Sequence, residues 1–216
     1  MVIAIDGPAA AGKSTVAQEL ATRLGYVYVD SGAMYRAVAL LALRRGLNLE
    51  DGAALERLAA QADIRFVLSP QGNRLLAAGE DLTEAIRAPE VSRAASIVST
   101  VPGVRREMVA QQRRLGQAGG VAGVVMEGRD IGTVVFPQAE IKVFLDASPE
   151  ARGRRRFQEN PQGRTLEQVT EEIRERDVRD RLRPHSPLLQ APGAIYLDST
   201  ELTPEEVVEK IAALAP

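Results

Sequence analysis

Residues 7–14, Gly7-Pro8-Ala9-Ala10-Ala11-Gly12-Lys13-Ser14, fit the pattern G-x-x-x-x-G-K-[ST] of a phosphate-binding loop. The motif directly follows the apolar run 2–5, so it lies between a predicted strand and a predicted helix, as such a loop requires. Its backbone N–H groups are expected to face a triphosphate, and the start of the helix adds its positive dipole end. Lys13 is predicted to reach the β- and γ-phosphates, and the Ser14 hydroxyl to bind the accompanying Mg²⁺.

The composition narrows the class of protein. A chain of 216 residues without cysteine can bury one core, and it has no disulfides or thiolate metal sites. No apolar run approaches the roughly 20 residues of a membrane-spanning helix, and no basic leader precedes the first strand, so we expect a cytoplasmic protein. The net charge of −2 creates no field that would attract nucleic acid or an anionic membrane. We therefore expect small-molecule substrates and neither of those partners.

Strand patterns alternate with helical patterns along most of the chain. A helix is predicted over 13–24, and the last helix is predicted to start at the capping sequence 203–206 and to run to the C-terminus. Alternation of this kind predicts an α/β fold with five parallel strands covered by helices, which binds ligands outside the carboxyl ends of its strands. The predicted strands are 2–6, 26–29, 123–127, 141–146 and 194–198.

One segment breaks this alternation. Short strand patterns at 64–67, 74–79 and 80–82, with a turn at 69–73, predict a small antiparallel meander. Because such a small sheet is marginally stable alone, we expect it to pack on the neighbouring helices as a subdomain.

Two polar stretches follow the second and third strands of the predicted sheet. Ser31 is predicted to cap a helix, and Arg36 follows just over one turn later, where its guanidinium can bind a phosphate. The stretch 127–133, Glu-Gly-Arg-Asp-Ile-Gly-Thr, predicts a sharp turn beside a ligand because it contains two glycines. Glu127 is well placed there to hold the water shell of Mg²⁺. A purely structural Arg-Asp pair within the turn is the alternative.

A predicted helix in the C-terminal third of the chain has one face that changes from apolar to charged along its length. Its apolar stripe continues, at the same spacing of three or four residues, as a charged stripe. Such a stripe leaves the core and enters a polar cleft, whereas the alternative is ion pairing on an exposed helix face. The apolar stripe is Leu166, Val169 and Ile173, and the charged stripe is Arg176, Asp180 and Arg183.

An arginine-rich stretch lies just before that helix. The segment 152–156 contains four arginines and is followed by the short loop 160–163 and by Arg164, which suits a lid that closes over phosphates. A nucleic-acid patch is the alternative, but only Phe157 interleaves the arginines, and aromatic residues are 4% of the chain. The single histidine, His185, is expected to be a loop residue.

Together these stretches resemble the bacterial cytidylate kinases, a family of P-loop nucleoside monophosphate kinases. The resemblance covers nearly the whole chain, and the antiparallel insert is its discriminating element, because the similar adenylate kinases lack it. Two features depart from the family: Glu127 stands where some members have Asp, and the lid is short. The resemblance rests on residues 7–15, 30–36, 93–96, 104–105, 127–133, 144–148 and 175–181, and on the insert.

The resemblance implies one P-loop kinase domain over residues 1–216. Its core would be 1–30, 119–150 and 185–216, its monophosphate-binding region with the β insert 31–118, and its lid with the following helix 151–184. ATP would be the phosphoryl donor, Mg²⁺ the cofactor and CMP or dCMP the acceptor, and we expect a monomer.

The resemblance also assigns site residues. The catalytic residues would be Lys13, Arg129, Arg176 and Arg183. ATP would be bound by Gly7, Pro8, Ala9, Ala10, Ala11, Gly12, Lys13, Ser14, Thr15 and Arg155, and Mg²⁺ by Ser14 and, through water, by Glu127. CMP would be bound by Ser31, Arg105 and Asp130 at the cytosine, by Ser96, Arg176 and Asp180 at the ribose, and by Arg36, Arg129 and Arg183 at the phosphate.

Other functions of a P-loop protein fit the sequence less well. A regulatory GTPase needs a D-x-x-G switch and an [NT]-K-x-D base-reading motif, and neither occurs in the chain. A nucleic-acid-binding ATPase needs a basic stripe, which the charge balance disfavours. A kinase for UMP or for another small phosphate acceptor stays open as the alternative.

Overall fold

The computed structural model describes residues 1–69, 72–117, 122–159, 161 and 163–215. The chain forms two compact units, which are Met1–Tyr28 with Gly119–Pro216, and Val29–Ala118. Within the described residues, no helix has the length and apolar character needed to cross a membrane.

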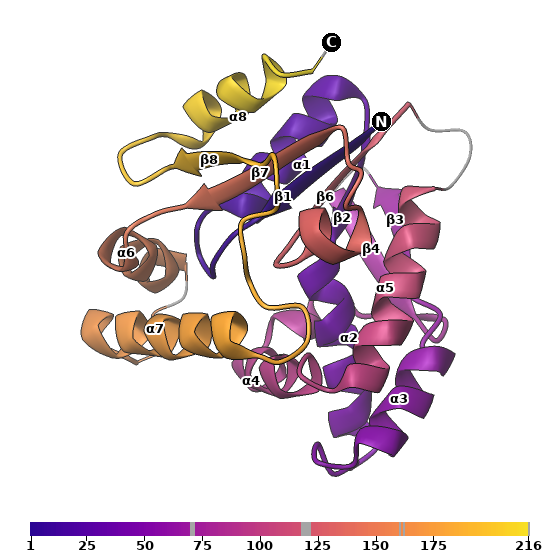
Figure 1. The fold of residues 1–216 in the computed structure, drawn as a ribbon. Helices are drawn as coiled ribbons and strands as arrows, with labels where there is room; N and C mark the ends of the chain where they lie inside the picture. The colour runs from indigo at the N-terminus through magenta and orange to yellow at the C-terminus, as the bar shows by residue number, and fades with distance from the viewer. Residues whose placement is uncertain (70–71, 118–121, 160, 162, 216) are drawn as a thin grey trace. The chain divides into compact units, whose positions relative to one another are not determined.

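A five-stranded parallel sheet has the strand order β2-β6-β1-β7-β8 (Figure 1). Ile5 in the central strand pairs with Glu127 on one side and with Val143 on the other, so the carboxyl ends of these three strands lie together. The prediction of five parallel strands is confirmed, although the second, third and fifth strands begin one residue later than predicted. The strands are β1 (Val2–Asp6), β2 (Val27–Asp30), β6 (Val124–Gly128), β7 (Ile141–Asp146) and β8 (Ile195–Asp198).

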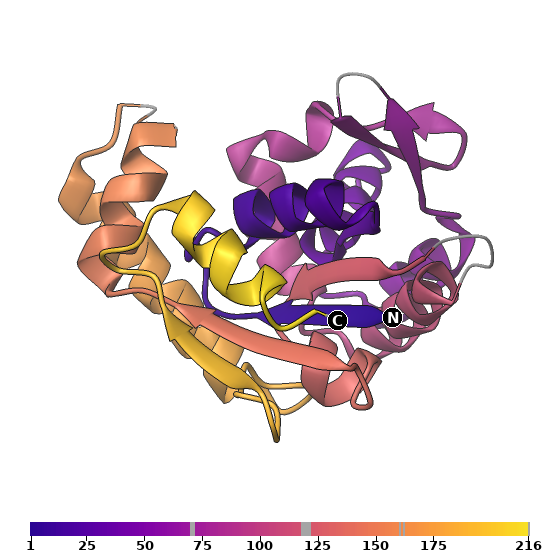
Figure 2. The ribbon, with the colours of Figure 1, turned by 90° about the horizontal axis from the view of Figure 1, so that it is seen from above.

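Among the described residues of the first unit, four α-helices accompany this sheet: α1 (Lys13–Leu24), α6 (Pro149–Glu159), α7 (Leu166–Leu182) and α8 (Pro204–Ala212). Helices α1 and α8 lie side by side on one face of the sheet (Figure 2), where Leu20 and Ile211 pack into the core with Ile3 and Ile5. Helices α6 and α7 contact each other as a hairpin. The predicted Thr203 cap of α8 is present, but the helix ends at Ala212 instead of running to the C-terminus.

The second unit is largely helical and has its own core. Buried side chains of its central helix, such as Met34 and Val38, pack with Leu55, Val91 and Met108 in one apolar cluster. The helices are α2 (Ser31–Arg44), α3 (Gly52–Gln61), α4 (Pro89–Val98), α5 (Pro102–Gly116) and the short 3₁₀ helix η1 (Ala85–Arg87).

The predicted antiparallel meander is confirmed in this unit. Strands β3 (Arg65–Ser69), β4 (Gly72–Ala77) and β5 (Glu80–Asp81) form one sheet in that order. Phe66 pairs with Leu75, and Leu75 is buried in the apolar cluster, so the meander packs on the helices as expected. Residues 70–71 of the predicted turn lie outside the described residues.

Candidate active site

The phosphate-binding motif forms the connection between β1 and α1. Gly7 is required there because a Cβ would overlap the backbone carbonyl of Leu145. Gly12 has a φ of 89° and Ala10 a φ of 59°, both in the left-handed region, so the loop curls tightly. Three carbonyls of the loop accept buried hydrogen bonds from side chains: Lys13 Nζ donates to Pro8 at 2.7 Å, Arg152 to Ala9 at 3.1 Å and Ser199 Oγ to Ala11 at 3.3 Å.

The N–H groups of this loop remain available to a ligand. Within the described part of the chain, no backbone N–H of Ala9, Ala10, Ala11 or Gly12 donates a hydrogen bond. Unpaired N–H groups at the start of α1 favour an anion, both through direct hydrogen bonds and through the helix dipole. The loop is therefore shaped to bind phosphate.

The motif lysine is almost fully buried, with 5% of its surface exposed. Burial, helped by the positive charge of Arg129, lowers the pKa of Lys13 to about 7. Glu127 and Asp6 act in the opposite direction, since their carboxylates favour the charged lysine. A phosphate arriving beside Lys13 would likewise favour its charged form.

Ser14 and Glu127 place two oxygen donors together. The Ser14 hydroxyl donates a short hydrogen bond to the Glu127 carboxylate, and Tyr28 donates a second one at 3.3 Å. Among the described residues, no group of three or more histidine, cysteine or carboxylate side chains could hold a metal by itself. A hydroxyl beside one carboxylate fits Mg²⁺, which keeps several waters and shares its coordination with substrate phosphates.

Asp6 connects the end of β1 to the segment after β6. Its buried carboxylate accepts hydrogen bonds from the N–H groups of Ile131 at 2.8 Å and Gly132 at 2.7 Å. These residues begin a π-helical turn, η2 (Ile131–Val135). Burial raises the pKa of Asp6 to about 6, although the two hydrogen bonds lower it. Asp6 is therefore occupied by the backbone and is unavailable as a metal ligand.

The alternative of a structural Arg-Asp pair within stretch 127–133 is wrong. Arg129 does not pair with its neighbour Asp130; its Nε lies 2.8 Å from Asp180 on α7. Asp130 instead faces Arg183 at 3.9 Å. The chain does bend at Arg129 and Asp130, as predicted, but neither Gly128 nor Gly132 has a positive φ. Gly132 is closely packed, since a Cβ there would lie 3.1 Å from the Lys142 side chain and 3.2 Å from that of Ala191.

Asp180 lies at the centre of a cluster of cations. Burial pushes its pKa up, but the guanidiniums of Arg129 and Arg176 outweigh burial, and the net effect is a lowered pKa. Arg176 Nε lies 4.0 Å from the carboxylate. The predicted charged stripe thus turns inward at Asp180 and is not a solvated face.

Two details of that stripe were wrong. Leu166 at the start of α7 is 40% exposed, and Arg183 follows the helix as its C-cap in an extended conformation. Asp177 was missed: it is buried on the same face and pairs with Arg152 at 2.6 Å.

Two further arginines of the predicted lid region, Arg155 and Arg164, bind the protein itself. Arg155, predicted to bind ATP, donates to the Ser199 carbonyl at 2.6 Å and to its hydroxyl at 3.1 Å. Arg164 pairs with Glu172 of α7 at 2.7 Å. Residues 160 and 162 of the predicted lid loop lie outside the described residues.

In the second unit, Asp30 and not Ser31 caps α2. The Asp30 side chain accepts the Ala33 N–H at 2.8 Å and also pairs with Arg36 at 2.7 Å. The prediction failed because either residue can cap a helix and β2 extends one residue further than expected. Ser31 is instead the first residue of α2 and is buried.

Arg105 and Ser96 are buried in the same unit. The Arg105 guanidinium stacks 5.4 Å from the ring centre of Tyr35 and donates to the Ser99 carbonyl at 3.1 Å. The Ser96 hydroxyl is buried and has no hydrogen-bond partner within the described residues. An unsatisfied buried hydroxyl is unfavourable unless a ligand completes it.

The structure brings together, within the first unit, the loop, Lys13, Glu127 and the cluster around Asp180. Tyr28, Asp177 and Ser199 support this site and were not predicted. Asp6 ends β1, at the edge of the sheet where the fold was predicted to bind its ligand, and Arg152 belongs to the predicted lid. Position just after the last strand was a usable signal for Ser199, because side chains at the carboxyl ends of parallel strands surround the ligand site.

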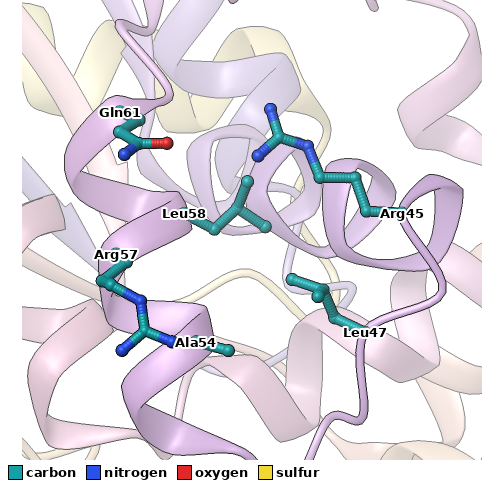
Figure 3. A pocket seen from close by; sticks show the side chains of 6 residues that line it. All are labelled: Arg45, Leu47, Ala54, Arg57, Leu58 and Gln61. Atoms are coloured by element: carbon teal, nitrogen blue, oxygen red, sulfur yellow. The ribbon is translucent and has the colours of Figure 1, made fainter.

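A pocket of about 210 Å³ lies elsewhere, in the second unit (Figure 3). The side chains of Leu47 and Leu58 form part of its wall, with Arg45 and Arg57 beside them. It shares no residue with the predicted ATP or CMP sites, and it contains no acidic side chain that could bind a metal.

Known proteins resemble this chain in sequence and fold. Cytidylate kinases of Solibacter usitatus and Bacillus licheniformis are 55% and 51% identical to it, covering 98% of this chain in each case and 90% and 94% of the relatives. A shikimate kinase structure from Bacteroides thetaiotaomicron has a TM-score of 0.52 at 16% identity, with 99% of this chain and 97% of that one covered, which shows a shared fold. The family model described as cytidylate kinase matches residues 3–216, and the chain therefore belongs to the cytidylate kinase family.

Proposed function

We propose that this protein transfers the γ-phosphoryl group of ATP to CMP, and also to dCMP, giving ADP and the nucleoside diphosphate. Family membership and the cytidylate kinase relatives support this reaction. The single observation that carries it is the gathering of Lys13, Arg129 and Arg176 near Glu127 beside a loop with free N–H groups. These groups supply the positive charge that phosphoryl transfer requires.

The chemistry needs no strong general base. A nucleoside monophosphate already presents an anionic oxygen as the nucleophile, so catalysis consists of positioning and charge stabilisation. Lys13 and the loop N–H groups would hold the donor phosphates, while Arg129, Arg176 and Arg183 would stabilise charge on the transferred group. Arginine suits this role because its planar fork binds phosphate at two points.

Mg²⁺ would be held by Ser14 and, through water, by Glu127, and when bound it would neutralise charge on the β- and γ-phosphates. The adjacency of these two side chains supports this assignment. Tyr28 would keep the Glu127 carboxylate oriented.

Recognition of CMP is assigned by resemblance. Ser31, Arg105 and Asp130 would read the cytosine, and Ser96, Arg176 and Asp180 the ribose. Three arginines, Arg36, Arg129 and Arg183, would bind the acceptor phosphate. Burial of Ser31, Ser96, Arg105, Asp130 and Asp180 supports the proposal, since buried polar groups discriminate strongly against a base that leaves them unpaired.

A coupled ADP-release assay over CMP, dCMP, UMP, AMP and GMP tests the proposed function. CMP should have the highest kcat/KM, dCMP should follow, UMP should be poorer, and the purine nucleotides should be nearly inert. Equal turnover of AMP and CMP would contradict the proposal, and preference for UMP would support the alternative. A monomeric state, a cytoplasmic location and the absence of nucleic-acid partners remain predictions.

A further inference from the structure

Arg152 lies buried in the first turn of α6, with 3% of its surface exposed, and binds three separate segments. Its Nε donates to the carbonyl of Ala147, just after β7, at 2.8 Å. One terminal nitrogen donates to the carbonyl of Ala9 in the phosphate-binding loop at 3.1 Å and lies 2.6 Å from the carboxylate of Asp177 on α7. One guanidinium thus links the loop, the sheet and α7.

The Ala9 carbonyl that Arg152 binds lies next to a residue with an unfavourable backbone conformation. Ala10, the next residue, has a φ of 59°, a conformation that is unfavourable for a residue with a Cβ and persists only where its surroundings fix it. Lys13 binds the neighbouring Pro8 carbonyl, but this lysine is the motif residue that reaches phosphate. Arg152 is therefore a cation that can hold the loop both with and without nucleotide.

The same contact fixes α7. Helices α6 and α7 approach closely, since a Cβ on Gly153 would overlap the Thr170 side chain. Asp177, buried beside Arg152, directly follows Arg176 and precedes Asp180 by one turn. Arg152 therefore contacts both the loop and α7, the helix that supplies Arg176 and Asp180 of the charged cluster.

We propose that Arg152 is a positioning residue for nucleotide binding, which holds the phosphate-binding loop in its curled conformation and ties it to α7 without contacting phosphate. The proposal rests on the proposed function only in that the loop binds a nucleotide. It differs from the lid prediction for this segment, in which the arginines close over the phosphates.

Calorimetric titration with ADP, in the absence of any acceptor, tests the proposal. Arg152→Lys keeps a cation beside Asp177, but one ammonium group lacks the fork that reaches both carbonyls. The Kd of this variant for ADP should rise about tenfold, which corresponds to a loss of about 1.4 kcal/mol of binding free energy. The matched control is Arg174→Met, because Arg174 also joins α6 to α7, through Glu150 at 2.8 Å, but lies on the surface and has no contact with the loop. Its Kd should change less than twofold.

Combining Ala10→Gly with Arg152→Lys separates loss of loop positioning from general destabilisation of the protein. Glycine accepts the left-handed conformation without strain, so Ala10→Gly should reduce the loss caused by Arg152→Lys to about threefold. The two substitutions should therefore be non-additive. Strict additivity, an unchanged Kd in Arg152→Lys, equal weakening in Arg174→Met, or loss of cooperative unfolding in Arg152→Lys would each overturn the proposal. Wild-type protein that binds ADP but phosphorylates no CMP would contradict the proposed function and leave this inference intact.

Discussion

The two units bury different kinds of polar group. Within the described residues, Val29–Ala118 buries one charged side chain, Arg105, together with neutral groups such as Ser31, Ser96 and Gln112. The other unit buries charges of both signs: Asp6, Lys13, Glu127, Asp130, Arg152, Asp177, Asp180 and Arg183.

Most groups that are proposed to act on the transferred phosphate, namely Lys13, Arg129, Arg176 and Arg183, belong to the unit that buries charge. A buried charge is costly unless it is paired, and phosphoryl transfer justifies that cost because charge develops on the transferred group. The neutral groups Ser31 and Ser96 are proposed to contact the base and the ribose, where one neutral hydrogen bond contributes less than one to a charged group. Substitutions in the charged set should therefore change catalysis strongly, and those in the neutral set should have smaller effects.

The largest effect is expected from Lys13→Met, which removes the motif charge. The kcat/KM should fall by roughly 10²-fold or more, while the melting temperature should stay unchanged or rise, because burial disfavours the ammonium. Steady-state kinetics and thermal unfolding measure the two quantities, with Lys210→Met, an exposed lysine on α8, as the control. Activity within tenfold of wild type would mean that this loop is not the triphosphate site.

Asp180→Ala should raise the KM for CMP by roughly 10- to 150-fold, the range expected for a hydrogen bond to a charged group. The KM for ATP should stay near wild type, and the loss should shrink with dCMP if the carboxylate reads the 2′-OH. Glu171→Ala, which removes an exposed carboxylate of the same helix, should leave both KM values unchanged. Equal losses for CMP and ATP would show that Asp180 only orients Arg129.

Asp6 should give the unfolding free energy an unusual pH dependence. Its folded pKa of about 6 lies above the ordinary value of 3.8, so the folded protein holds more protons between these values. The contribution is fully present below about pH 4 and is lost as pH rises through about 6, with a size of roughly 1–3 kcal/mol. Urea unfolding from pH 4 to 7 should show this fall, and Asp6→Asn should remove it.

Asp180 and Asp198 have the opposite effect on the pH dependence of the unfolding free energy, and they act outside the range of pH 4 to 7. Their pKa values are lowered, so their contributions are present at higher pH and are lost as pH falls below about 4. They therefore do not mask Asp6. A slope that persists in Asp6→Asn would assign the effect to another group.

The smallest effect is expected from Ser96→Ala in the neutral set. Since the hydroxyl has no partner among the described residues, removing it should leave the free energy of unfolding unchanged or raise it by up to about 1 kcal/mol. The KM for CMP should rise roughly 2- to 10-fold through the loss of one neutral hydrogen bond. A loss as large as that of Asp180→Ala would erase the distinction between the two sets.

Local patterns were sufficient to predict most of the fold. The limits of α1 and β7 agree with the predicted ranges, because Gly25 ends the helix and the apolar run 141–146 has clear borders. Both ends of β2 and of β6, and the start of β8, lie one residue later than predicted, since the last hydrogen bond of a ladder depends on the neighbouring strand. At Asp30 that single residue also decided which side chain caps α2.

Local patterns could not predict which buried partners would meet. Asp6 binds N–H groups 125 and 126 residues further along the chain, and Arg129 pairs with Asp180 rather than with its sequence neighbour. Likewise, helical spacing alone does not show which arginine of 152–156 is buried, because that depends on the approach of α7. Only tertiary structure separates Arg152 from the exposed Arg154.

The burial of Lys13 also has a consequence for the solvent. Because burial lowers the pKa of Lys13 to about 7, its ammonium group loses its proton far more readily than that of an exposed lysine. A bound triphosphate stabilises the ammonium form, so binding should take up protons from the buffer. The heat of binding would then depend on the ionisation enthalpy of that buffer, and ATP affinity would weaken as the medium becomes alkaline.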